Sequence, residues 1–279
     1  MKNLMILGAS GHVSNAVLHQ LIHHRNWLNN LILGDKNKKL LADKYIDHKG
    51  LAYTFIHKKI DPEKRELEYT NLLKKYKINK MLDLTDAETI PLIEKTNKEN
   101  VDYINTAMNS ENKTVYELIL EVIKRKKEFN KARHILCSGM NPGVVNMWVR
   151  YGIEKCGIPN EVVHFEYDTS IFSKKIKPMI TWSIHEFLVE DIRDPGGIMK
   201  GKEKEQELYP NAMKNEVDME PILKPILKLK NYPRGSEVLH EENVSISEKY
   251  NIPSKFIYSV NDLTMQFIRK VYKNRKNIL

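Results

Sequence analysis

The sequence has few of the residues that build extracellular scaffolds and no stretch that could span a membrane. Its 279 residues include only two cysteines, Cys137 and Cys156, whose spacing is not that of metal ligands. Two isolated cysteines exclude a disulfide framework and indicate reduced thiols. No run approaches the roughly 20 apolar residues that cross a bilayer, and no charged leader with a cleavable apolar segment is recognisable. The sequence therefore predicts a cytoplasmic protein without a membrane partner.

The sequence also lacks a basic stripe of the kind that binds nucleic acid. The formal net charge is +9, but the 45 basic residues are spread over the whole chain and are mostly lysine. Arginine would dominate a surface that clamps phosphates or reads bases. We therefore interpret the positive charge as a solvated lysine-rich surface and expect no nucleic-acid partner.

The chain opens with an apolar strand that runs directly into a turn of small residues. A glycine turn followed by a helix presents backbone N–H groups that attract the pyrophosphate of a dinucleotide. Ser10 and Val13 stand where the Gly-x-Gly-x-x-Gly pattern has its second and third glycines, so a strand-turn-helix without a ligand remains an alternative. The expected cofactor-binding residues of this turn are Gly8, Ser10, Gly11, His12 and Val13.

An acidic residue follows the glycine turn at the distance expected for a ribose ligand. Asp35 ends the second apolar strand, about 20 residues past the turn, where a carboxylate would bind the ribose 2′-hydroxyl of NAD. Lys36, Lys38 and Lys39 come next and could instead pair with a 2′-phosphate. The sequence therefore predicts NAD as the cofactor, with NADP as the alternative.

Strands and helices alternate through the first half of the chain, and this alternation predicts an α/β fold. We expect a Rossmann-type doubly wound parallel sheet over residues 1–140 and an α+β catalytic domain over residues 141–279. Prolines and charges predict a loop-rich segment over 194–235. In the second domain the patterns predict a helix over 184–192 and a strand over 238–246.

Acidic and aromatic side chains recur in the second half at spacings that suggest a site for a cation. Glu166 and Asp168 lie two apart on a predicted strand and so share one face, and His240 and Glu242 repeat this arrangement. A solvated face with ordinary ion pairs is the alternative. Trp182 could hold an ammonium by cation–π attraction or could be a core residue. A single histidine beside acids predicts no metal site.

Four short motifs, at residues 138–145, 166–169, 181–183 and 240–246, occur in an order and rough spacing that resemble a known family. The chain resembles bacterial homospermidine synthase, which is related to saccharopine dehydrogenase and carboxynorspermidine dehydrogenase. The resemblance extends over nearly the whole chain. It implies an enzyme that uses bound NAD to oxidise an amine carbon of putrescine or spermidine to an imine, lets a putrescine amine attack, and returns the hydride.

The resemblance also implies roles for individual residues. Thr85 and Thr106 correspond to strand ends on the nicotinamide side of the sheet. Substrate-binding residues would be Glu166, Asp168, Trp182 and Glu242. Catalytic residues would be Glu166, Trp182, His240, Glu242 and Asn141, whose amide would lie near the carboxamide or the substrate amine and whose side chain could cap the following helix.

The sequence departs from the family pattern in ways that keep other functions open. Asn109 replaces a family glutamate, and full-length relatives continue beyond the position of Tyr258 with a further section. We therefore expect a truncated member, completed by homodimerisation or by a separate C-terminal chain. One alternative is a catalytically silent homologue that binds only nucleotide or a partner. A saccharopine-type or carboxynorspermidine-type dehydrogenase is a further alternative, although the motifs carry few arginines to clamp a carboxylate substrate.

Overall fold

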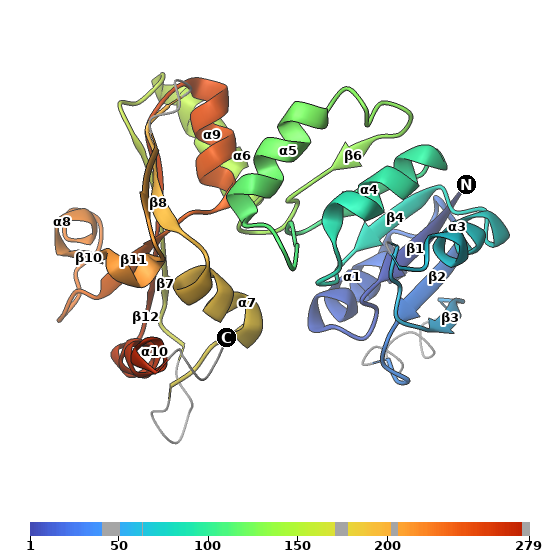
Figure 1. Cartoon of the computed structure of the whole chain (residues 1–279), viewed down its shortest axis with the longest axis horizontal. Helices are drawn as coiled ribbons and strands as arrows, with labels where there is room; N and C mark the ends of the chain where they lie inside the picture. The colour runs from blue at the N-terminus through green and yellow to red at the C-terminus, as the bar shows by residue number, and fades with distance from the viewer. Residues whose placement is uncertain (41–50, 63, 171–177, 202–205, 275–279) are drawn as a thin grey trace. The chain divides into compact units, whose positions relative to one another are not determined.

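A computed structural model describes residues 1–40, 51–62, 64–170, 178–201 and 206–274 of the chain (Figure 1). The chain divides into two compact units. Unit 1 consists of Met1–Lys113 and Glu117–Val144, and unit 2 consists of Thr114–Tyr116 and Val145–Leu279. In the described part of the chain, no helix is both long and apolar enough to cross a bilayer.

Unit 1 is built on a six-stranded parallel sheet in the order β3-β2-β1-β4-β5-β6. This is the strand order of doubly wound dinucleotide-binding sheets, so the predicted fold class is confirmed. The elements of unit 1 are β1 (Lys2–Leu7), α1 (His12–His23), β2 (Leu28–Asp35), β3 (Thr54–His57), α3 (Glu66–Lys75), β4 (Lys80–Asp83), α4 (Thr89–Lys98), β5 (Asp102–Asn105), α5 (Val115–Arg125) and β6 (His134–Ile135).

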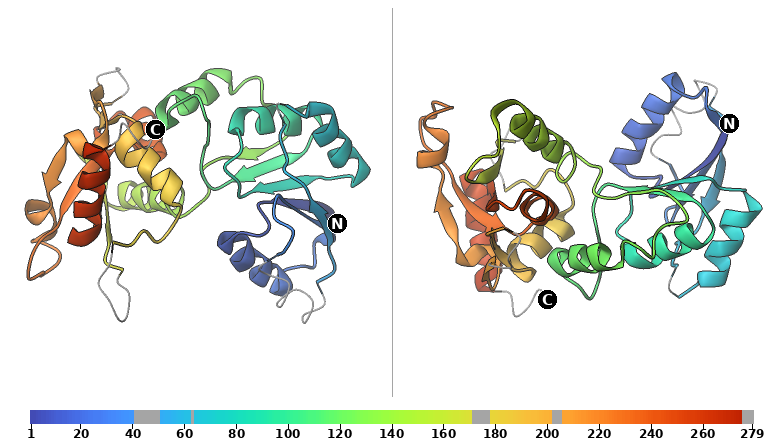
Figure 2. Two further views of the ribbon diagram at one scale, coloured as in Figure 1. Left: turned by 60° about the horizontal axis from the view of Figure 1, so that its bottom comes forward. Right: turned by 90° about the horizontal axis from the view of Figure 1, so that it is seen from above.

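Helices cover both faces of this sheet because its strands are apolar on both sides. Leu4 and Ile6 of β1 pack in one core with Leu18 of α1. The alternate residue Met5 packs in the opposite core with Tyr69 of α3. Figure 2 shows helices on either side of the unit 1 sheet. The near-continuous apolar run of β1 is typical of a parallel strand that is buried on both faces.

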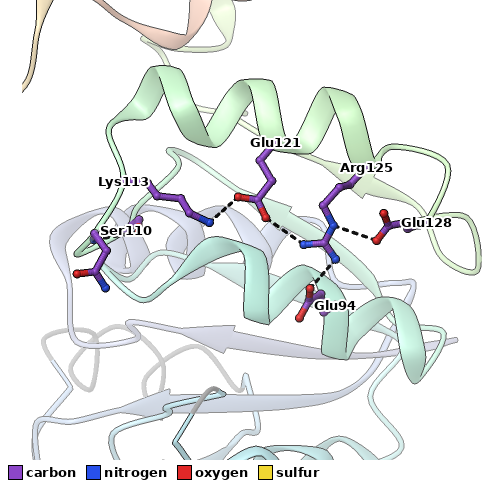
Figure 3. Close-up of polar contacts among 7 residues, drawn as sticks. Glu94, Ser110, Lys113, Glu121, Arg125 and Glu128 are labelled. Carbon is purple, nitrogen blue, oxygen red and sulfur yellow. Dashed lines mark hydrogen bonds and ion pairs between the residues drawn. The ribbon is translucent and has the colours of Figure 1, made fainter.

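Arg125 ties helix α5 to helix α4 on the outside of unit 1 (Figure 3). Its guanidinium donates to Glu94 of α4 at 2.6 Å, to Glu121 at 3.1 Å and to Glu128 at 2.9 Å. Lys113 donates to the other carboxylate oxygen of Glu121. An arginine shared among three acids forms a network of ion pairs. Such a network holds two helices together more firmly than an isolated surface ion pair does.

Unit 2 contains a mixed, mainly antiparallel sheet in the order β10-β11-β12-β8-β9, with β7 parallel to β12. Its strands are β7 (Val162–Asp168), β8 (Gly196–Met199), β9 (Gln206–Tyr209), β10 (Glu216–Asp218), β11 (Arg234–Val238) and β12 (Ser254–Val260). Its helices are α6 (Val144–Cys156), α7 (Ile184–Leu188), the π-helical η2 (Val189–Arg193), the 3₁₀ turn η3 (Ala212–Lys214), α8 (Glu220–Leu223), α9 (Glu241–Tyr250) and α10 (Asp262–Lys273).

The segment 194–235, predicted to be loop-rich, contains the short elements β8, β9, η3, β10 and α8, and the described residues between them belong to no helix or strand. One prediction for unit 2 is wrong. The predicted strand over 238–246 is divided between the end of β11 and the helix α9. His240 and Glu242 therefore lie at the start of a helix, where a spacing of two does not place side chains on one strand face.

Candidate functional site

The glycine turn after β1 is closely packed against the neighbouring strand end. Gly8 has a φ of +76°, and a Cβ at this position would lie 2.4 Å from the carbonyl oxygen of Leu84. Only glycine combines this conformation with so close an approach. The turn thus carries the main-chain conformation that a dinucleotide-binding loop needs, although its second and third glycine positions differ from the pattern.

The start of helix α1 is suited to an anion. Gly11 is the N-cap residue, no side chain caps the first turn, and that turn holds no acidic residue. Val13 is 57% exposed, so a side chain at the third glycine position does not crowd the sheet. The buried hydroxyl of Ser10 has no hydrogen-bond partner among the residues that the structure describes. Uncapped amides at a helix N-terminus fit the pyrophosphate of a dinucleotide.

Asp35 is bonded to the glycine turn itself. One carboxylate oxygen accepts from the backbone N–H of Ser10 at 2.7 Å, and the other accepts from the N–H of Asn37 at 2.7 Å. The residue is 7% exposed. Asp35 therefore holds the turn against the end of β2, a structural role in addition to the ribose contact predicted from its position.

The other predicted cofactor-binding residues follow β4 and β5. The hydroxyl of Thr85 donates to Asp83 at 2.6 Å and closes the loop after β4. Burial raises the pKa of Asp83, while hydrogen bonds from Thr85 and Tyr103 oppose that rise. Thr106 follows β5 and lies close to Gly139, where a Cβ would approach the Thr106 carbonyl oxygen to 3.0 Å. The predicted residues of unit 1 thus follow the carboxyl ends of neighbouring parallel strands, the edge at which such sheets bind ligands.

Asn141 does not cap helix α6. The helix begins at Val144, so Gly143 occupies the N-cap position and Asn141 lies two residues before it. The peptide bond between Asn141 and Pro142 is cis. The expectation that the Asn141 side chain caps the following helix is therefore wrong, because the chain makes one more turn before the helix starts.

In unit 2, β7 and β12 bring acids and a tyrosine to one face of the sheet. Glu166 is paired in register with Tyr258, and Asp168 with Val260. Register partners on adjacent strands point to the same face, as do residues two apart on one strand. The predicted pair of acids, Glu166 and Asp168, therefore lies beside the phenol of Tyr258, whose pKa is raised by burial and by these neighbouring charges.

Trp182 lies at this same face. Its indole N–H donates to the hydroxyl of Tyr258 at 3.2 Å, and its ring packs edge-on against Phe187 of α7 at 6.1 Å between centroids. The neighbouring Thr181 donates to Asp168 at 2.7 Å. Burial raises the pKa of Asp168, but hydrogen bonds from Ser170 and Thr181 outweigh it and lower that pKa overall. Glu166, Asp168 and Trp182 are thus brought together, and the indole stays 40% exposed.

His240 lies within a buried group of carboxylates. Its Nδ1 is 2.5 Å from Glu242 and 3.2 Å from Glu241, and its Nε2 is 3.4 Å from Glu190 of η2. Burial alone would lower the pKa of His240, but the three carboxylates raise it well above its ordinary value. In the described residues, Glu190 and Glu242 form ion pairs with His240 alone. These two carboxylates beside one imidazolium leave an excess of negative charge.

Stacked rings connect this histidine with the tyrosine. The His240 ring stacks on Phe256 at 5.1 Å, and Phe256 stacks on Tyr258 at 6.5 Å. His164 of β7 stacks on the same phenylalanine at 6.3 Å. The two groups of predicted residues therefore lie along one face of the unit 2 sheet. We call the face formed by Glu166, Asp168, Trp182, Glu190, His240, Glu242 and Tyr258 the acid–aromatic face.

Three residues near this face were missed by sequence reasoning. Glu190 and Asp191 come from the π-helical segment η2, which turns both toward the interior, and Tyr258 comes from the middle of β12. Asp191 is 2% exposed, and burial together with Glu190 raises its pKa well above the ordinary value. The sequence does contain a signal for Glu190 and Asp191, because they stand between the apolar residues Val189 and Ile192. Charged residues among core positions often belong to a functional site.

The geometry at His240 favours an ion pair over a metal centre. One ligand atom each from His240, Glu241 and Glu242 lie within 4.8 Å of one another. The 2.5 Å separation of His240 Nδ1 and the Glu242 oxygen is a hydrogen-bond distance. Two ligands on one zinc ion, each at about 2.0–2.2 Å, would lie more than about 3 Å apart.

Comparison with known proteins supports the assignment of unit 1. Residues 4–137 match the family model described as the saccharopine dehydrogenase NADP binding domain. A search of curated proteins found no significantly similar sequence. The family description names NADP, whereas the position of Asp35 predicts NAD.

Solved structures resemble the chain only distantly. The WlbA dehydrogenase from Thermus thermophilus has 9% identity and a TM-score of 0.46, with 99% of this chain and 78% of that chain covered. The scyllo-inositol dehydrogenase from Lactobacillus casei has 8% identity and a TM-score of 0.49, covering 94% and 68%. The myo-inositol dehydrogenase from the same organism has 10% identity and a TM-score of 0.45, covering 95% and 68%. By strand order and glycine turn, residues 4–137 form a Rossmann-type fold, and the same residues, just under half of the chain, are similar to the saccharopine dehydrogenase NADP binding domain.

Proposed function

We propose that the chain is a homospermidine synthase-like enzyme that binds NAD and acts on polyamines. It would oxidise a carbon next to an amine of putrescine or spermidine to an imine, join it to a second putrescine, and reduce the new imine. With putrescine as both substrates, two molecules give homospermidine and ammonia, and the dinucleotide is regenerated. The observation that carries this proposal is the acid–aromatic face of unit 2.

The acid–aromatic face has the chemistry of a site for ammonium groups. Glu166 and Asp168 supply carboxylates beside the partly exposed indole of Trp182, and an aromatic ring attracts a cation through its face. The excess negative charge around His240 attracts a second cationic group. A saccharopine-type substrate carries carboxylates, which these acids would repel, so a polyamine is favoured.

His240 is the group best placed to exchange protons with an amine. An amine must be neutral to lose a hydride or to attack an imine, and a leaving amine must gain a proton. The imidazole is held by Glu190 on one nitrogen and Glu242 on the other, which fixes its orientation. In its protonated form His240 can donate from Nε2 to the leaving nitrogen when that amine takes the place of Glu190, which lies 3.4 Å away, while Glu242 at 2.5 Å from Nδ1 stabilises the charge on the ring.

The residues of unit 1 fit a dinucleotide. Amides of the turn formed by Gly8, Ser10, Gly11, His12 and Val13 would hold the pyrophosphate, Asp35 would accept from the ribose, and Thr85 and Thr106 would line the nicotinamide side. When bound, NAD supplies the hydride acceptor. Asn141 would contribute an amide near the carboxamide. We favour NAD because a second anion, the 2′-phosphate of NADP, would meet the carboxylate of Asp35.

A product assay with one matched pair of variants tests the proposal. Purified chain incubated with NAD and putrescine should form homospermidine, detected by mass spectrometry. Glu242→Gln should lower the turnover at least tenfold because it removes a charge that holds His240. Glu248→Gln, the same change on the same helix at a partly exposed position, should leave turnover unchanged. Retained dinucleotide binding without any product would instead support a silent binding protein.

A further inference from the structure

The side chain of Tyr258 connects the indole of Trp182 to the core of unit 2 through a hydrogen bond. The phenol is 6% exposed, whereas the indole is 40% exposed. The tyrosine hydroxyl accepts the indole N–H at 3.2 Å. Phe187 packs edge-on against both rings, at 6.1 Å from the indole and 5.5 Å from the phenol. A hydrogen bond and one ring contact thus join a partly exposed aromatic side chain to a buried strand.

The hydroxyl of Tyr258 is not needed for packing. Phe256, two residues earlier on the same face of β12, fills the core with a bare phenyl ring and stacks against Tyr258 at an interplanar angle of 15°. A buried phenol without a partner would be costly, so the oxygen must be satisfied locally. Because it accepts from Trp182, its own proton is available to the acids that face it, Glu166, Asp168 and Asp191. The oxygen therefore joins the indole to a strand that lies within the electrostatic influence of these carboxylates.

We propose that Tyr258 is a positioning residue that fixes the indole of Trp182 beside Glu166 and Asp168, so that one ammonium group meets the ring and the carboxylates together. This inference rests on the proposed polyamine function. A tryptophan with 40% of its surface exposed has several rotamers available. Every rotamer other than the observed one would lose the alignment of the ring with the acids. The hydrogen bond to a buried strand selects one of them before the substrate arrives.

The variant Tyr258→Phe removes only the oxygen and keeps the ring. The chain has three tryptophans, Trp27, Trp148 and Trp182, so an NMR spectrum of ¹⁵N-labelled protein contains three indole N–H signals. The signal of Trp182 is assigned by its loss in Trp182→Phe. In Tyr258→Phe it should move upfield and exchange faster with water, while the other two signals stay in place. Ser236→Ala, which removes a hydroxyl from the residue paired with Tyr258 on β11, should move none of them.

Putrescine binding to the same variants tests the consequence for a ligand. Tyr258→Phe should weaken putrescine binding about 3- to 10-fold, as expected for one lost hydrogen bond. In a Trp182→Phe background the same change should have almost no further effect, because the two residues act through one contact. A purely structural role would instead give additive losses in the double variant.

The outcomes separate this inference from the function on which it rests. If the wild-type chain binds putrescine and Tyr258→Phe binds it equally well, or if the Trp182 signal does not move, the positioning role of Tyr258 is wrong and the polyamine proposal stands. If the wild-type chain binds neither putrescine nor spermidine, the proposed function is wrong and the role of Tyr258 in it falls as well. Circular dichroism of each variant establishes that the fold is retained.

Discussion

At the scale of single residues, Asp35 combines a structural role with the ribose contact proposed for it. Its two carboxylate oxygens accept from the backbone of Ser10 and Asn37. An acid in this position stabilises the glycine turn and also repels a 2′-phosphate. Asp35→Asn removes the charge without changing the size of the side chain and keeps one oxygen that can accept from the backbone of the turn.

We expect Asp35→Asn to weaken NAD binding by about 1–3 kcal/mol, because a charged acceptor for the ribose hydroxyls is lost. The same variant should gain in NADP binding relative to NAD, since the repulsion of the 2′-phosphate disappears. Calorimetric titration with both dinucleotides measures the two affinities. Wild-type chain that binds NADP more tightly than NAD would contradict the cofactor proposed for it.

His240 should make the stability of the protein depend on pH in a characteristic direction. Its pKa in the folded chain is raised well above 6.5, mainly by Glu242, Glu241 and Glu190. Protonated His240 stabilises the folded chain, and this contribution to the free energy of unfolding is fully present below about pH 6.5. It is lost as the pH rises through the folded-state pKa, at up to about 1.4 kcal/mol per pH unit. Urea unfolding of His240→Gln between pH 6 and 9 should show a smaller decline than the wild type.

The neighbouring His164 is the control for this measurement because its shift has the opposite sign. Burial lowers the pKa of His164, and Glu242 only partly opposes that effect. Protonation of His164 therefore destabilises the folded chain as the pH falls below about 6.5. In His164→Gln this acid-side loss should disappear while the decline above pH 6.5 remains. An unchanged profile in both variants would mean that neither histidine has the predicted environment.

At the scale of elements, helix α10 depends on a side-chain cap. Asn261 accepts from the backbone N–H of Thr264 at 3.1 Å at the first turn of α10. Met265 and Ile268 of that helix pack into the core that contains Tyr258. The cap therefore positions a helix that supports the acid–aromatic face.

Asn261→Ala should lower the free energy of unfolding by about 1 kcal/mol, the usual effect of losing such a cap. Asn261→Asp should retain most of the stability, because a carboxylate also accepts from the helix N-terminus. The exposed C-cap variant Asn274→Ala serves as the control and should change the unfolding energy little. Equal stabilities of Asn261→Ala and the control would show that the cap does not contribute.

The sequence was a good guide to elements with long, regular patterns. The apolar runs of β1 and β2 and the helix α1 between them follow from local periodicity, as does the helical segment that begins at Ile184. The segment 238–246 shows the limit of that reasoning. Its alternating apolar residues suggested a strand, but Glu241 and Glu242 stand in the first turn of a helix, where acids are favoured, and Asn243 accepts from the backbone N–H of His240.

The candidate site was only partly predictable because its parts come from distant segments. Glu166, Trp182, His240 and Glu242 were all identified from the sequence. The contact between Glu190 and His240 depends on how η2 packs on the sheet, and no local pattern encodes it. The parallel pairing of β7 with β12, which places Tyr258 beside Glu166, joins segments about ninety residues apart and is equally invisible to periodicity.

At the scale of the whole molecule, the proposed reaction requires both units. Unit 1 carries the residues that fit a dinucleotide, and unit 2 carries the acid–aromatic face. A hydride that leaves the amine carbon and later returns to the same substrate requires the dinucleotide to stay bound throughout. Free exchange of the reduced dinucleotide would turn the same fold into an ordinary dehydrogenase.

The measurement that tests this account most directly uses putrescine deuterated on both carbons that carry nitrogen. The purified chain is incubated with this substrate and unlabelled NAD at a concentration below that of the enzyme, and the products are weighed by mass spectrometry. The account predicts that each molecule of NAD supports the formation of several molecules of homospermidine. This homospermidine should retain nearly all the deuterium of both putrescine molecules. Absence of homospermidine, with the dinucleotide still bound, would contradict it.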